Sequence, residues 1–194
     1  ITGSANATMT LDNIENEAYG EFSVSAWDAY GIETWNSPLG AVDNQGTIDG
    51  SVSATLDVTD FGTLATGNMV VNQFSTADVS AGYAYGVSIG SGNITASFDN
   101  SGAISGSVMA AANLQGITTT AGMPVADLYS VDVSAYSAYG VEINNSSIGG
   151  SLTNSGSISA MATATANVSN FLEIDYDVEA EASEAYGLGI GGSG

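Results

Sequence analysis

Apolar and polar side chains alternate with a period of two along several stretches of this chain, most clearly between Ile48 and Thr59. One side of that stretch carries small or branched apolar residues, and the other side carries hydroxyl and carboxyl groups. Such alternation is typical of a strand with one buried face, and no helical period of 3.6 residues competes with it. Because alanine fills many of the apolar positions, we expect a narrow core between strands that lie close together.

The alternating stretch occurs four times, at intervals of 47 to 56 residues. Its apolar positions align in four columns: Ile1, Ile48, Ile104 and Ile158; Ala5, Val52, Val108 and Ala162; Ala7, Ala54, Ala110 and Ala164; Leu11, Val58, Leu114 and Val168. We therefore expect a single repetitive domain over residues 1–194. Its repeats span about 1–47, 48–103, 104–157 and 158–194, and the last repeat is incomplete.

A second alternating stretch in each repeat ends in the phrase Ala-Tyr-Gly. The tyrosines and glycines of this phrase form a structural repeat: Tyr30, Tyr85, Tyr139 and Tyr186, followed by Gly31, Gly86, Gly140 and Gly187. The alternation breaks one residue before the phrase, which indicates a corner or a bulge. We expect the glycines to supply the backbone freedom that this corner requires.

The rest of each repeat divides into a short strand and a variable part. The short strand is expected over 94–98 and again over 148–152, and each copy is followed by an Asn-x-Gly turn. Between the two alternating stretches the repeats differ in length and sequence, as over 60–76 and 115–127. We expect loops to leave the body of the domain there.

Together these elements predict an all-β fold, and specifically a parallel β-helix, or β-solenoid. A period of about 54 residues is too long for one turn of such a fold, so each repeat is expected to span two to three turns. Right-handed winding is expected, because it is the commoner outcome for irregular repeats of this kind. Tandem β-sandwich modules are the alternative, and they would need longer repeats with more strands in each.

The combination of Ala-Tyr-Gly-Val/Ile with Asn-Ser-Gly-x-Ile-x-Gly-Ser-Val resembles the repeats of bacterial autotransporter passenger domains and related secreted β-helical adhesins. The resemblance covers nearly the whole chain. It implies an exported, elongated protein that is extracellular or attached to the cell surface through bacterial secretion. The resemblance leaves the secretion route open.

The charge balance narrows the choice of partners. The chain has no Lys, Arg or His against 21 Asp and Glu residues, so its formal net charge is −21. Nucleic acid and anionic membranes are therefore not expected as partners, because no side-chain cation can replace their counterions. Cysteine is also absent, which excludes disulfides and thiolate metal sites. No apolar run reaches the length needed to span a bilayer.

A row of acids near the end of the chain is the one candidate metal site: Glu173, Asp175, Asp177, Glu179 and Glu181. In a strand these carboxylates share one face and repel each other unless they are screened or bridged. These residues can be interpreted in two ways. They form a solvated acidic face, or they bind calcium, which takes six to eight oxygen ligands. The calcium-binding nonapeptide and the EF-hand loop are both missing. Asp78 and Asp132 are equivalent to Glu179, but two or more turns are expected to separate the three, too far to share one ion.

The tyrosine column has two interpretations. In the first, each tyrosine is a structural corner residue whose ring covers the turn; in the second, the column is an aromatic strip that binds carbohydrate. Catalysis is not expected, and no catalytic or cofactor-binding residue is assigned. The acids lie in different columns in different repeats, and no basic side chain is available to tune a pKa.

These features predict an extracellular structural protein, a stalk or filament subunit that assembles head to tail with copies of itself. Repeats without polar caps are templates for further pairing, which favours such assembly. A surface adhesin that binds a glycan or a receptor through loops such as 59–76 is the first alternative. A polysaccharide-degrading enzyme is the second, and it would need a pair of carboxylates at a set separation.

Overall fold

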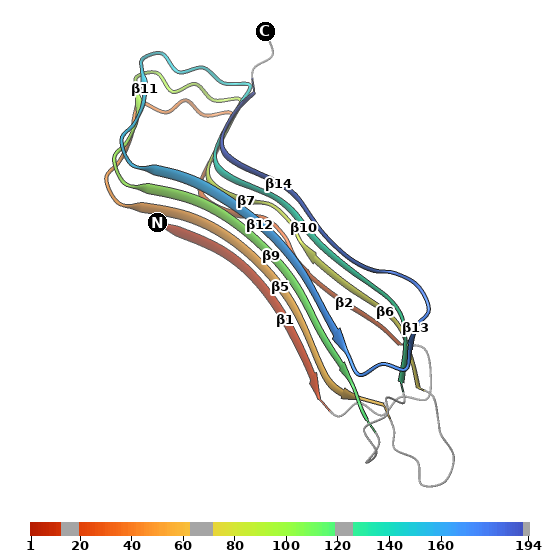
Figure 1. Cartoon of the computed structure of the whole chain (residues 1–194). Coiled ribbons are helices and arrows are strands. Elements are labelled where there is room, and N and C mark those ends of the chain that lie inside the picture. The colour runs from red at the N-terminus through yellow and green to blue at the C-terminus, as the bar shows by residue number, and fades with distance from the viewer. Residues whose placement is uncertain (13–19, 63–71, 119–125, 192–194) are drawn as a thin grey trace, which may run out of the picture.

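The computed structural model describes residues 1–12, 20–62, 72–118 and 126–191, and the chain is all-β in those ranges (Figure 1), as expected. Each repeat contributes one layer of strands. The first layer contains β1 (Thr2–Asp12), β2 (Gly20–Ala26), β3 (Ala29–Trp35) and β4 (Val42–Asn44). The second contains β5 (Thr47–Phe61), β6 (Asn72–Ala81), β7 (Ala84–Gly90) and β8 (Phe98–Asn100). The third and fourth contain β9 (Ala103–Gly116), β10 (Ala126–Asn144) and β11 (Leu152–Asn154), then β12 (Ser157–Ser169), β13 (Glu173–Ile174) and β14 (Val178–Gly191).

The strands form three parallel sheets, which lie side by side and curl into a half-barrel (Figure 1). The first sheet has the strand order β1-β5-β9-β12. The second has the order β2-β6-β10-β7-β3, and β13 and β14 also pair with β10. The third is small, with the order β11-β8-β4. Because β10 is continuous over 19 residues, it pairs with both β6 and β7 of the layer below.

The prediction of a parallel β-helix, or β-solenoid, with two to three turns in each repeat is wrong. Ile48 pairs directly with Ile104, and Ile104 pairs directly with Ile158, so a whole repeat makes only one layer. Long strands account for this, because they take up many of the residues in each repeat: β5 has 15 residues and β10 has 19, whereas strands of about 5–6 residues are usual. Right-handed winding was expected for a β-solenoid, so that expectation does not apply to this fold.

The register between strands confirms the alignment of the repeats. Ala5 pairs with Val52, Val52 with Val108, and Val108 with Ala162, and the columns that begin at Ala7 and Leu11 continue in the same way. In the fourth column, Ile104 pairs with both Ile48 and Ile158. Each side chain of the first sheet therefore stacks on its equivalent from the neighbouring repeat.

The third sheet begins a few residues later than expected. Its strands β8 and β11 follow isolated bridges that join Leu39 to Ile94 and Ile94 to Ile148. Asparagines at the Asn-x-Gly turns form a ladder along this sheet, in which Asn44 Nδ2 donates to Asn100 Oδ1 and Asn100 Nδ2 donates to Asn154 Oδ1, both at 2.7 Å. Such ladders are typical of parallel stacks in which equivalent residues lie above one another. The variable loops expected over 60–76 and 115–127 fall largely on 63–71 and 119–125, outside the described residues.

Two apolar clusters form the core. The larger one lies between the first and second sheets and includes Leu56 of β5 and Val133 of β10, both fully buried. The smaller one lies where all three sheets meet and includes Phe98 and Ile104, also fully buried. The alanines of the larger cluster let the two sheets lie close together, as the sequence predicts.

The corner before each Ala-Tyr-Gly phrase separates β2 from β3 and β6 from β7, whereas β10 and β14 run through it. The glycines of the phrase do not have a positive φ, so they are not needed for left-handed backbone. A Cβ on Gly86 would lie 2.5 Å from the carbonyl oxygen of Gly140 and 2.6 Å from Cγ2 of Ile104. Gly31, Gly86 and Gly140 are therefore required by the close approach of the next layer of their own sheet and of the isoleucine column of the first sheet, which differs from the expected reason. Gly187 is less crowded, because a Cβ there would have its nearest neighbour at 3.3 Å.

A second glycine column faces the first from the opposite sheet. A Cβ on Gly50 would overlap the carbonyl oxygen of Tyr85, and a Cβ on Gly106 would overlap that of Tyr139. The first and second sheets thus touch backbone to backbone beside the tyrosine column. This contact fixes where the tyrosines leave the body of the molecule.

Replacing one of these glycines should destabilise the fold. We expect Gly106→Ala to lower the free energy of unfolding by about 3 kcal/mol, because the methyl group meets backbone that cannot move without separating the sheets. Gly46→Ala is the matched control, since a Cβ at that turn has no atom within 4 Å. Urea unfolding followed by circular dichroism measures both changes. Equal stability of the two variants would contradict the proposed sheet contact.

Candidate functional site

Four tyrosines form a continuous ladder on the second sheet. The ring centroids of Tyr30 and Tyr85 are 5.0 Å apart, those of Tyr85 and Tyr139 are 5.1 Å apart, and those of Tyr139 and Tyr186 are 5.4 Å apart. The planes of the first two pairs differ by only 4° and 6°, so the rings are stacked. The in-register pairing of the sheet creates the ladder, because it places each Ala-Tyr-Gly phrase directly above the previous one.

The ladder lies in an acidic, partly desolvated environment. Burial is the main reason why the pKa of Tyr30 is raised to about 12, and the neighbouring carboxylates of Asp28 and Glu33 raise it further. Burial also raises the pKa values of Tyr85 and Tyr139, with Glu142 as the next cause for both. Tyr30, Tyr85 and Tyr139 therefore stay protonated well above neutral pH.

Stacking decides what the ladder can bind. A sugar ring binds an aromatic side chain across the face of the ring, but here the faces of successive tyrosines cover one another. Of the four rings, only Tyr186, at one end of the stack, is exposed, with 44 % of its surface accessible. The geometry therefore favours the structural interpretation of this column over the carbohydrate-binding strip.

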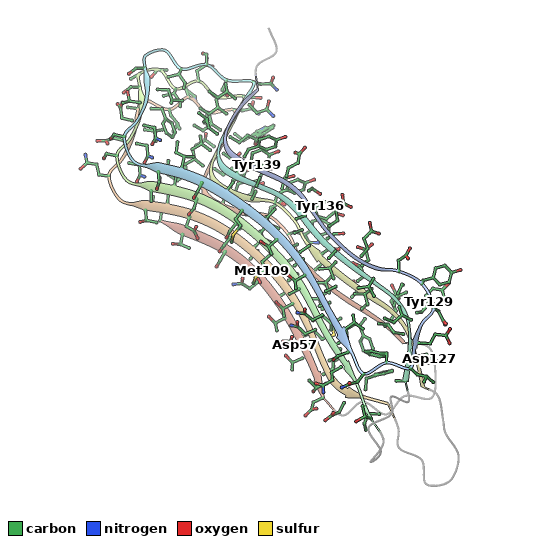
Figure 2. The ribbon with its side chains drawn as sticks, viewed as in Figure 1. Asp57, Met109, Asp127, Tyr129, Tyr136 and Tyr139 are labelled. Atoms are coloured by element: carbon green, nitrogen blue, oxygen red, sulfur yellow. The ribbon has the colours of Figure 1, made fainter. Side chains whose placement is uncertain are left out.

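A second aromatic group, formed by Trp27, Tyr83 and Tyr136, lies beside the ladder. Tyr83 stacks on Tyr136 at 5.9 Å and on Tyr85 at 6.5 Å, and Trp27 stacks with Tyr136 at 6.3 Å. Figure 2 shows Tyr136 next to Tyr139 along β10. The sequence interpretation missed this group, although an aromatic residue does stand one or two positions before each of the first three Ala-Tyr-Gly phrases.

The candidate calcium ligands do not form one regular row. Glu173 lies in β13, Glu179 and Glu181 lie in β14, and Asp175 and Asp177 lie in the segment between these strands. That segment is held by the backbone of β10, where Val131 donates to the carbonyl oxygen of Asp177 at 3.0 Å. Within the described ranges, no group of three or more Asp and Glu residues is arranged to hold a metal ion. Calcium binding by these five residues stays a prediction.

The acids of neighbouring repeats are closer together than the sequence predicts. Asp132 pairs with Asp78 on one side and with Glu179 on the other, so the three carboxylates lie in adjacent layers. The expectation that two or more turns separate them is wrong, because each repeat makes a single layer. Carboxylates directly opposite one another in a sheet destabilise the pairing.

Burial disfavours the charged form of two other carboxyl groups of β10. The pKa of Asp127 is raised by burial and then by the charges of Asp175 and Glu173, and its Oδ1 is buried with no hydrogen-bond partner. Burial raises the pKa of Glu142, which lies beside the tyrosine ladder. Both groups cost folding free energy when they are ionised.

Hydroxyl and amide donors take the role that cations have in other proteins. Several carboxylates accept a hydrogen bond from the next layer of the first sheet: Asp12 from Thr59 at 2.7 Å, Asp49 from Ser105 at 2.5 Å and Asp57 from Asn113 at 2.6 Å. A hydrogen bond to an ionised oxygen is roughly twice as strong as one between neutral groups. These contacts let a chain without side-chain cations pack its acids layer on layer.

No family model matches this chain, and no curated protein or solved structure is found to be similar to it. Over the ranges that the structure describes, there is no helix long and apolar enough to cross a membrane. The arguments about function therefore rest on the residues and their geometry.

Mild acid should stabilise the fold. The folded state binds protons at Asp127 and Glu142 more tightly than the unfolded state does, so protonation favours folding. We expect the melting temperature to rise as the pH falls from about 7 through the raised pKa values, with the gain complete near the ordinary values of 3.8 and 4.5. Calorimetry measures this slope, which should be flatter in the double variant Asp127→Asn, Glu142→Gln. A melting temperature that falls over this range would contradict the prediction.

Alkali should destabilise the fold through the ladder. Above the ordinary tyrosine pKa of 10.0 the unfolded chain loses protons that Tyr30 retains up to about pH 12, so stability falls as the pH rises through that window. Phenolate absorbance at about pH 11 should therefore be lower in the folded chain than in urea. Tyr85→Phe should reduce the difference. Equal absorbance in both states would count against the buried ladder.

Proposed function

We propose that this chain is a structural subunit of an extracellular fibre, which grows as copies of the chain add end to end along the direction in which the layers stack. The proposed setting is a bacterial cell surface, where a chain without Lys or Arg offers trypsin-like proteases no cleavage site. The single observation that carries the proposal is that both outer edges of the first sheet present the same columns of residues.

The two edges are complementary because each repeat uses one pattern. In β12 the inward residue Ala162 is half-buried, whereas its equivalents Val52 and Val108 in the inner strands are fully buried. At the other edge, Ala5 of β1 is also half-buried. If β12 of one copy pairs with β1 of the next copy, Ala162 meets Ala5 in the register that the inner layers already use. Uncovered strand edges are templates for this kind of pairing.

The second and third sheets contribute to the same contact. Tyr186, with one face open, would stack on Tyr30 of the next copy and continue the ladder. A hollow of about 540 Å³ opens beside Ile1, Ile32 and Leu39 at the first layer, and exposed apolar side chains such as Ile190 lie at the fourth. A head-to-tail contact between unlike surfaces of this kind generates a fibre.

The net charge of −21 opposes association, so assembly should depend on salt. Ions at about 0.15 M screen charges over distances beyond about 8 Å, which weakens the repulsion between copies. Each copy adds four layers, so the fibre should have an axial repeat of about 19 Å built from spacings of about 4.8 Å.

The adhesin alternative depends on loops such as 59–76, most of which lie outside the described residues. No contact or hollow on the described surface favours a glycan or a receptor over a second copy of the chain.

One substitution at the edge tests the proposal. Ala162→Lys should abolish end-to-end association, because the lysine can reach solvent in a single chain but would be buried against Ala5 of the next copy. Ser159→Lys is the matched control, since it places the same charge on the exposed face of the same strand. Sedimentation velocity and negative-stain microscopy in added salt measure the outcome. The proposal fails if the unaltered chain stays monomeric, or if both variants assemble equally.

A further inference from the structure

A closer pair of tyrosines lies away from the ladder, where β10 meets the fourth layer. The ring centroids of Tyr129 and Tyr176 are 4.5 Å apart and their planes are tilted by 39°. A side-chain hydrogen bond with Tyr176 is the main reason why the pKa of Tyr129 is raised, and burial and the charge of Asp175 raise it further. Figure 2 shows Tyr129 on the outside of the molecule, near Asp127.

The backbone holds this pair in place. The amide of Tyr176 donates to the carbonyl oxygen of Tyr129 at 2.8 Å, and the amide of Asp175 donates to that of Leu128 at 2.9 Å. Both rings remain accessible, with Tyr129 41 % and Tyr176 63 % exposed. Residues far apart in the sequence are thus fixed side by side within reach of a reagent in solution.

We propose that Tyr129 and Tyr176 are an oxidative cross-linking site, at which hydrogen peroxide and a haem peroxidase join the two rings as dityrosine. Each phenol gives up one electron and one proton, and the two radicals combine at the ring carbons next to the hydroxyls. The hydrogens on those carbons return to the oxygens, so the chain loses two hydrogen atoms in all. The peroxide accepts both electrons and both protons and leaves as two molecules of water.

The geometry favours this pair over the ladder. The ring centroids of Tyr129 and Tyr176 are closer than those of any neighbouring pair in the ladder, at 4.5 Å, and the carbons that must bond are the direct neighbours of the C–O carbons. In the ladder the ring centroids lie 5.0 to 5.4 Å apart, and Tyr30, Tyr85 and Tyr139 are more buried than either ring of this pair. The acid charge of Asp175 and Asp127 around the pair also favours a neutral oxidant over an anionic one.

The cross-link would fasten the least buried part of the molecule. Among the described residues, no strand pairs with the outer side of the fourth layer, and every residue of β13 and most residues of β14 are exposed. A bond from Tyr176 to β10 would hold this layer on the third one. The chain has no Cys and no Lys, so neither a disulfide nor a lysine isopeptide bond can do the same. This inference does not depend on end-to-end assembly, because both tyrosines belong to one chain.

The test treats the whole chain with hydrogen peroxide and a haem peroxidase at low protein concentration. We expect blue dityrosine fluorescence in the monomer fraction, and an intact mass lower by two hydrogen atoms. Methionine oxidation, by contrast, adds an oxygen atom. Digestion after acidic residues should release a linked pair of peptides that contain Tyr129 and Tyr176. The oxidised chain should also unfold at a higher urea concentration than the untreated chain.

Three conservative variants make the test specific. Tyr129→Phe and Tyr176→Phe should each lose the linked peptides, while Tyr136→Phe, which removes a hydroxyl from the exposed pair of Tyr83 and Tyr136, should retain them. Circular dichroism confirms that each variant is folded. The Ala162→Lys variant should form the same link, which separates this result from the outcome for assembly. A link that maps to other tyrosines, forms only between chains, or survives in Tyr129→Phe overturns the proposal.

Discussion

In-register pairing between successive repeats is the interaction on which the rest of this structure depends. Ile48, Ile104 and Ile158 lie above one another, and so do the asparagines of the turns and the tyrosines of the ladder. A residue type that stacks well on itself gains from this arrangement in every layer, as stacked aromatic rings and asparagine amides do. The sequence repeats because the fold requires each position to be compatible with its own equivalent.

The same pairing makes charge the most difficult feature of the chain. An acid that recurs in every repeat would place carboxylates in an unbroken column, and the chain has no side-chain cation to separate them. Most acidic columns are instead interrupted by a hydroxyl or an amide, as where Ser105 follows Asp49 and Ser88 precedes Glu142. The column of Asp78, Asp132 and Glu179 is an exception, and it lies on the exposed face of the second sheet. The variation between repeats is therefore as necessary as their similarity.

Much of the fold could be predicted from the sequence, because alternation and repeat alignment report directly on strands and on register. The pairing of Ala5 with Val52 and of Val108 with Ala162 follows from aligning the repeats. That a whole repeat makes only one layer could not be predicted in this way. Alternation shows which side chains point inward, but it does not show that a strand as long as β10 continues through the corner.

The number of layers in a repeat also decides which acids are neighbours. With two or three turns in each repeat, Asp132 would lie far from Asp78 and Glu179, whereas in the structure the three are direct neighbours. The tyrosine column was recognised, but whether its rings turn their faces or their edges to solvent depends on the spacing between layers, which the sequence does not contain. The contact between Tyr129 and Tyr176 is hard to predict for a different reason. Aligning Tyr139 with Tyr186 also places Tyr176 on Tyr129, but Tyr176 lies in the segment between β13 and β14, so the alignment does not show that the two rings meet.

The layered arrangement also explains why stability and assembly are linked in this molecule. Each inner layer is covered on both sides, so Val52 and Val108 are fully buried, whereas Ala5 and Ala162 in the outer layers are covered on one side only. Adding a layer therefore buries the apolar residues of the layer beneath it, and the hydrophobic stabilisation of a stack grows with its length. In such an architecture the outer layers are always the weakest part. The proposed contact with another copy and the proposed covalent bond from the fourth layer to the third would each stabilise an outer layer.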